Sequence, residues 1–185
     1  MSLLSISSIN SDFLSKLSQN SSIQKNHKLT FLNLHSSISS LLVCILIDNT
    51  KKESYEKIIK SQKKSIFTSK GNIQITILDF IERMKKYMKI DEMTFILGLI
   101  YLERFCKESK IVLTQFNIYR LYFISVLIAL KYQEDIYFKN TFYAKICGVN
   151  ISNLNKMEYE FAIGINFDFY VDLLLFNKYK QLLSD

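Results

Sequence analysis

The residues that could carry out chemistry in this sequence are few and stand apart from one another. His27 and His35 are the only histidines, and neither has the HExxH spacing or a cysteine partner that a zinc site needs. The glycines form no phosphate-binding loop and no GxSxG turn. Glu134 and Asp135 are adjacent acids, but neighbours in sequence do not face each other as an acid–base pair requires. We therefore predict no catalytic residue, metal, cofactor or small-molecule substrate, and a regulatory or scaffolding role.

The cysteines offer thiol chemistry, but their spacing argues against a shared site. Cys44, Cys106 and Cys147 are odd in number, far apart and surrounded by apolar residues, and no CxxC pair occurs. This pattern is typical of buried free thiols in a reducing compartment. We therefore expect an intracellular protein, located in the nucleus, the cytoplasm or both.

One carboxylate stands out by its position. At about 100° per residue, Glu158 falls on the apolar stripe of its predicted helix, between Leu154 and Phe161. A carboxylate beside a packed face needs a cation or several donors, and Lys131, which ends an otherwise apolar helix, is the candidate partner. The alternative is that Lys131 only complements its helix dipole while Glu158 extends to water. Pattern alone slightly favours this alternative.

The composition indicates which elements position these residues. The chain has 185 residues, is 49% apolar and contains no proline and only four glycines. Because turn-forming residues are scarce, we predict a single all-α domain rather than a turn-rich β fold. The net charge is +7 and the lysines are spread along the chain, which favours simple solubility over a nucleic-acid surface.

The predicted organisation begins with a Ser- and Asn-rich tail over 1–28, flexible or forming one loose helix, followed by a compact domain over 29–185. A leading amphipathic helix covers 31–46. Residues 49–72 are lysine-rich and are interpreted as a solvated loop, although ion pairs at i,i+4 spacing would also allow a short exposed helix.

Helical periodicity predicts five further helices and a trailing one, over about 75–89, 91–107, 117–132, 140–147, 153–166 and 172–183. Asp91 and Ser152 are expected as N-caps and Gly148 as a C-terminal cap. The third of the five is apolar on every side, so the others must surround it. The most apolar segments, 41–47 and 121–130, are too short to span a bilayer, and no targeting segment is recognised.

Several segments together resemble the cyclin box of the P/U-type (phosphate-response) cyclins. The segment 128–148, IALKYQEDIYFKNTFYAKICG, resembles the group's AxKFxDDxYxNxxYAKxGG segment, and 151–161 resembles the ISxxELNxLExxF segment that follows it. The first helix carries FIERMKKY (80–87) and the second YLERF (101–105), where most cyclins have a YLDR pattern. The likeness runs from about residue 38 to residue 183.

The resemblance implies one five-helix cyclin box over about 73–170 with a leading and a trailing helix. It implies a heterodimer with a cyclin-dependent kinase, in which Lys131 and Glu158 pair at the kinase-facing surface. The resemblance therefore favours an ion pair between these two residues over the alternative in which each faces water. It further implies that Glu134 and Asp135 contact kinase cations or merely solvate a loop. Other residues that it implicates are the bordering aromatics Phe138, Phe142 and Tyr143, and a buried ion pair of Arg83 with Glu103.

Two other functions stay open at this point. Transcription factors also use cyclin-like boxes, but they combine two boxes with a zinc ribbon, so nucleic acid is not the expected partner. An adaptor that binds a kinase without activating it differs from a cyclin only in activity. The first helix lacks the MRAIL patch that recruits substrates in many cyclins, and reads IQITI over 73–77.

Overall fold

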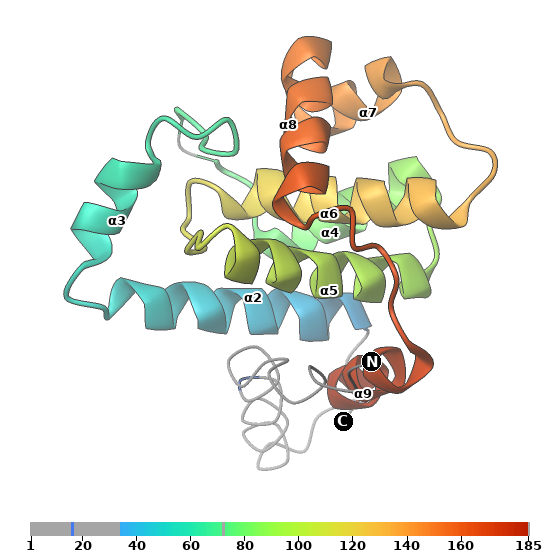
Figure 1. The fold of residues 1–185 in the computed structure, drawn as a ribbon, viewed down its shortest axis with the longest axis horizontal. Coiled ribbons are helices and arrows are strands. Elements are labelled where there is room, and N and C mark those ends of the chain that lie inside the picture. Colours follow the sequence, from blue (N-terminus) through green and yellow to red (C-terminus); the bar gives the residue numbers. More distant parts are fainter. Residues whose placement is uncertain (1–15, 17–33, 72, 185) are drawn as a thin grey trace, which may run out of the picture.

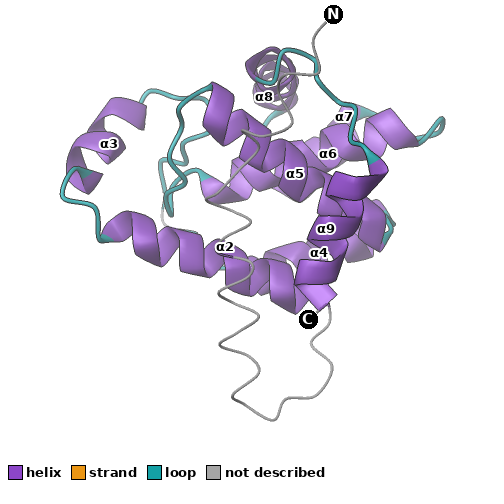
Figure 2. Cartoon of the chain, turned by 60° about the horizontal axis from the view of Figure 1, so that its bottom comes forward, coloured by secondary structure: helices purple, strands orange, loops and turns teal. Residues whose placement is uncertain are grey.

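The computed structural model describes residue 16 and residues 34–71 and 73–184, and in this part of the chain all regular structure is helical (Figure 1, Figure 2). The predicted all-α class is therefore confirmed, whereas the predicted tail over 1–28 lies outside the described residues apart from Lys16. The helices are α2 (Leu34–Thr50), α3 (Tyr55–Gln62), α4 (Ile77–Met88), α5 (Glu92–Glu108), α6 (Ile118–Gln133), α7 (Asn140–Cys147), α8 (Ile151–Gly164) and α9 (Leu173–Ser184).

The centre of the fold is α6. All residues from Leu121 to Leu130 are buried, because α4, α5 and α8 pack around this helix (Figure 1). Its closest neighbour is α5, which approaches at Gly98, where an added Cβ would lie 2.5 Å from Cγ2 and 2.9 Å from Cα of Val126. The predicted buried third helix is confirmed, and Gly98 is the residue that allows the two backbones to come together.

Capping residues set the helix ends close to their predicted positions. Asp91 is the N-cap of α5, since its Oδ1 accepts hydrogen bonds from the backbone N–H of Thr94 (2.8 Å) and from its hydroxyl (2.7 Å). Gly148 ends α7 with a φ of 74°, as predicted. The prediction of Ser152 as an N-cap was wrong, because Asn150 takes that role and accepts from the N–H of Asn153 over 2.7 Å.

The preferred interpretation of residues 49–72 as a loop was also wrong. Residues 55–62 form the helix α3, which is the short exposed helix that the alternative allowed, in a segment held at both ends by hydrogen bonds to distant residues. Asn49 donates to the carbonyl of Leu113 over 2.9 Å, and Arg120 donates to the carbonyl of Ile66 over 2.9 Å. His35 is fully buried on α2, where its Nδ1 lies 2.9 Å from Oε1 of Glu82 on α4.

Candidate functional site

A polar cluster lies where the C-terminal end of α6 meets α7 and α8. Lys131 is in the last turn of α6, and its Nζ donates to Oε1 of Glu158, on α8, over 2.5 Å. The two side chains are 19% and 20% exposed, so the pair is covered on one side and open on the other. The predicted juxtaposition of Lys131 and Glu158 is thus confirmed, and the alternative in which they do not meet is not observed.

Asn140 completes the cluster, and sequence reasoning had not selected it. It is the first residue of α7, where its Oδ1 accepts from Lys131 Nζ over 2.7 Å. Its Nδ2 donates to Glu158 Oε2 over 2.7 Å and to Asn155 Oδ1 over 2.8 Å. One amide therefore bridges both charges and fixes their distance. The sequence did contain one indication of this residue, because the cyclin-box segment that 128–148 resembles also has an asparagine three residues before its YAK motif.

The cluster retains hydrogen-bonding capacity toward solvent. A lysine ammonium has three donors, and two of those on Lys131 are directed to Asn140 and Glu158. The Glu158 carboxylate accepts one bond on each oxygen within the described residues and can accept more. Because both charges are partly desolvated and held in one geometry, they can bind a partner's backbone N–H and C=O groups without being reordered.

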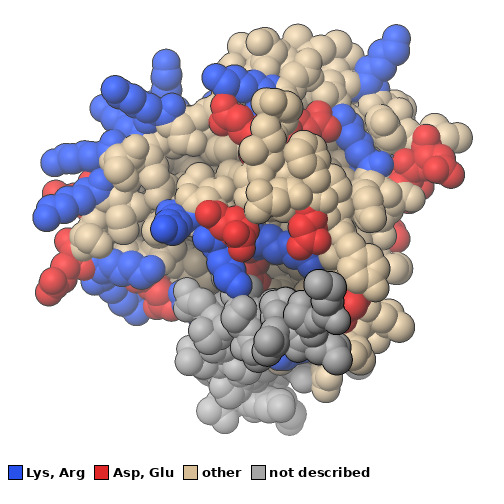
Figure 3. Space-filling view, in the orientation of Figure 1, with Lys and Arg blue, Asp and Glu red and all other residues tan. Residues whose placement is uncertain are grey.

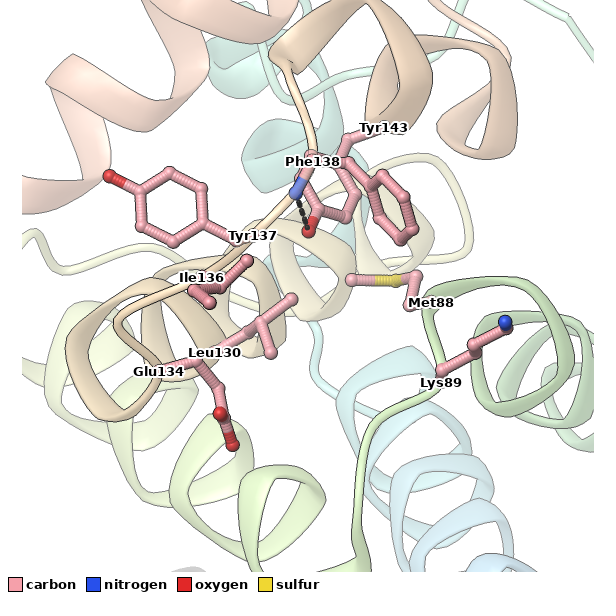
Figure 4. A pocket seen from close by; sticks show the side chains of 8 residues that line it. All are labelled: Met88, Lys89, Leu130, Glu134, Ile136, Tyr137, Phe138 and Tyr143. Carbon is pink, nitrogen blue, oxygen red and sulfur yellow. Dashed lines mark hydrogen bonds between the residues drawn. The ribbon is translucent and has the colours of Figure 1, made fainter.

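The loop between α6 and α7 presents apolar side chains beside this cluster. Ile136 is 91% exposed, and Tyr137 and Phe138 are about half exposed. Together with Met88 at the end of α4, they border a cavity of about 260 Å³ (Figure 4). Large apolar side chains on an exposed loop are typical of a protein-binding surface.

The predicted acids lie on the same loop. Glu134 and Asp135 are both exposed, and Glu134 ends α6 with its backbone N–H bonded to the carbonyl of Leu130 (2.9 Å). The Glu134 side chain also lines the cavity (Figure 4). Both carboxylates are therefore placed where a bound partner could meet them.

The three predicted aromatics form one cluster but differ in exposure. The ring centroids of Phe138 and Phe142 are 4.5 Å apart, and those of Phe142 and Tyr143 are 5.6 Å apart. Tyr143 is 1% exposed, which rules it out as a contact residue in this conformation. Its hydroxyl oxygen instead accepts a hydrogen bond from the Phe138 backbone N–H over 3.2 Å (Figure 4). Tyr143 thus holds the loop that presents Phe138.

The predicted ion pair of Arg83 with Glu103 is not formed. Arg83 is exposed on α4, and its Nη2 donates to the carbonyl of Lys145 on α7 over 3.5 Å. Glu103 is 4% exposed on α5. The Arg83 guanidinium is therefore directed toward α7, so the sequence resemblance misplaced this contact.

The part of the chain that the structure describes lacks two other kinds of functional feature. No group of three or more histidine, cysteine or acidic residues there is arranged to hold a metal ion. Among the described helices, none has the length and apolar character to cross a bilayer.

Comparison with known proteins identifies the class of fold. Residues 6–169 match the sequence model of the family described as Cyclin. The chain is 33% identical over 126 residues to Cyclin-U4-1 of Arabidopsis thaliana, an alignment that covers 68% of this chain and 62% of that protein. It is 29% identical over 143 residues to Cyclin-P3-1 of Oryza sativa subsp. japonica, covering 75% and 60%.

The chain therefore belongs to the cyclin family, and its relatives support the P/U type. This family is regulatory rather than catalytic. The aligned part spans about three fifths of the length of these curated relatives.

Proposed function

We propose that this protein binds a cyclin-dependent protein kinase and activates it. The observation that carries the proposal is the Lys131–Asn140–Glu158 cluster, which is held at 2.5–2.7 Å and left partly open to solvent. In this proposal, Lys131 and Glu158 bind backbone groups of the kinase near its movable C-helix. The cluster supports this role because its charges are already partly desolvated and oriented before the partner arrives.

Most of the affinity would come from the apolar loop beside the cluster. Ile136 and Phe138 present large exposed surfaces, and burying such side chains is the usual source of binding energy at interfaces. The charged cluster would then set the register, since a misplaced partner would leave Lys131 and Glu158 desolvated and poorly paired.

Activation would follow from differential affinity. If the proposed surface binds the active position of the kinase C-helix more tightly than the inactive one, binding shifts the kinase toward activity by that difference. To raise the active population from about 1% to about 99%, the difference must be about 10⁴-fold, or roughly 5.5 kcal/mol. An interface that combines an oriented charge pair with several apolar anchors can supply such a difference.

The test is a titration of purified protein against a panel of cyclin-dependent kinases, with peptide phosphorylation as the readout. The proposal predicts saturable activation of at least one kinase. Saturable binding without activation would instead define an adaptor. Absence of binding to every kinase, together with salt-sensitive binding to nucleic acid, would replace the proposal with the nucleic-acid alternative.

A further inference from the structure

A second surface lies at the opposite end of α6 from the Lys131 cluster. The segment 51–70, which contains α3, holds seven lysines and two glutamates and so contributes +5 of the chain's net charge of +7. Figure 3 shows basic side chains gathered on the side of the molecule where Figure 1 places α3. Most of the net charge therefore belongs to one segment, which the fold places on one side of the molecule.

This basic surface surrounds a cavity of about 530 Å³. Lys60 on α3, Lys63 directly after this helix and Lys70 from the following segment line it, while Ile59 and Phe116 supply apolar walls. The three lysines are exposed, and the two apolar side chains are partly buried. The cavity can therefore hold an apolar group while cations stand around its rim.

Hydrogen bonds between distant segments hold the walls of this cavity in place. The hydroxyl of Thr68 donates to the carbonyl of Gln62 at the end of α3 over 2.7 Å. The backbone N–H of Ser69 donates to the carbonyl of Phe116 over 2.7 Å. Arg120 donates to the carbonyl of Thr68 over 3.0 Å. Because these contacts exist without a ligand, binding would require little reordering.

We infer that this cavity binds an acidic peptide segment of a partner protein, with one apolar side chain between Ile59 and Phe116 and flanking carboxylates on Lys60, Lys63 and Lys70. Charge complementarity selects an acidic partner. A peptide fits better than nucleic acid because the cations ring one apolar cavity, whereas single-stranded nucleic acid is bound along a basic groove with successive aromatic platforms.

The location of this cavity relative to the Lys131 cluster indicates how the two sites could work together. The 16 residues of α6 make it about 24 Å long, with the cavity at its start and the Lys131 cluster at its end. A kinase on the Lys131 side would leave the basic cavity open, so an acidic substrate or inhibitor could be held beside the kinase. The binding site itself does not depend on the kinase proposal and can be tested on the chain alone.

The experiment is fluorescence anisotropy with the full chain and a labelled peptide in which a central leucine is flanked by glutamates. We expect saturable binding that weakens as salt is raised and falls about tenfold when the leucine is replaced by alanine. The triple variant Lys60→Glu/Lys63→Glu/Lys70→Glu should lose at least about tenfold in affinity.

The matched control places the same charge change on exposed lysines elsewhere, as Lys85→Glu/Lys145→Glu/Lys178→Glu, and should bind within about twofold of the wild type after thermal melts show that both variants fold. Equal losses in both triple variants would overturn the inference, because the attraction would then be unspecific. Absence of peptide binding, or tighter binding of a single-stranded oligonucleotide than of the peptide, would overturn it as well.

Discussion

The side-chain amide of Asn140 donates to Glu158 over 2.7 Å while the same side chain accepts from Lys131, so an uncharged residue sets the geometry of an ion pair between two helices. Without this bridge, a lysine and a glutamate that are each about one-fifth exposed could turn toward water separately. The site therefore depends on the first turn of α7 as much as on the two charges.

Replacing Asn140 tests this dependence. Asn140→Ala should weaken kinase binding about tenfold, since hydrogen bonds to charged groups contribute about 1.5–3 kcal/mol. Asn140→Asp should weaken it further, because a carboxylate would repel Glu158. Calorimetric titration measures both, with the exposed Asn177→Ala on α9 as the control. Wild-type affinity in Asn140→Asp would show that the bridge has no part in binding.

The loop after α6 allows a test of how much its apolar side chains contribute to kinase binding. Ile136 is 91% exposed, so Ile136→Ala should leave the melting temperature unchanged and weaken kinase binding about tenfold. Leu174 on α9 is 84% exposed and serves as the matched control, since Leu174→Ala removes a similar side chain away from the loop. If both variants bind the kinase equally well, the loop is not the contact surface.

The contact between α5 and α6 predicts a stability effect. Gly98→Ala places a Cβ 2.9 Å from the Val126 Cα, a backbone atom that cannot turn aside. Overpacking of this kind costs about 1–3 kcal/mol, so we expect a melting temperature lower by roughly 2–12 °C. Gly71→Ala is the control, because no atom lies within 4 Å of its added Cβ. An unchanged melting temperature in Gly98→Ala would show that the helices can move apart freely.

Thiol burial predicts a decline in stability in alkali. Burial raises the pKa of Cys147 from 9.0 to about 12, and burial also raises the pKa of Cys106. Between pH 9 and pH 12 the unfolded chain loses the Cys147 proton while the folded chain keeps it, so the free energy of unfolding falls as pH rises.

Urea unfolding at about pH 8 and about pH 10.5 measures this decline. The decline should be smaller by roughly 2 kcal/mol in Cys147→Ala than in the wild type. If the two proteins lose the same free energy over this range, the Cys147 thiol ionises as easily in the folded chain as in the unfolded one.

The presence of most helices and the burial of α6 could be predicted, because the spacing of apolar residues alone defines them. The run from Leu121 to Leu130 has no polar face and must be enclosed, as the structure confirms. The helix α3 could not be predicted in this way, since it has few apolar residues and belongs to a segment anchored by Asn49 and Arg120 across more than 50 residues of sequence.

The site was predictable in its charges but not in its geometry. Glu158 lay on an apolar stripe and Lys131 ended an apolar helix, so each needed a partner. Whether Asn140 points inward, whether Tyr143 is buried, and which way Arg83 extends depend on how α4, α7 and α8 are rotated about their axes. Local sequence does not determine these rotations, because packing against distant helices decides them.

The most direct test of the proposed function is the affinity of a Lys131→Ala/Glu158→Ala variant for the kinase that the wild-type chain binds. The control is Lys156→Ala/Glu160→Ala, which removes an ion pair of 3.6 Å from the same helix as Glu158 but from its opposite face. We predict a loss of about 30-fold or more, or roughly 2 kcal/mol, in the first variant and less than about twofold in the control. Wild-type affinity in the Lys131/Glu158 variant would contradict the proposed kinase-binding site.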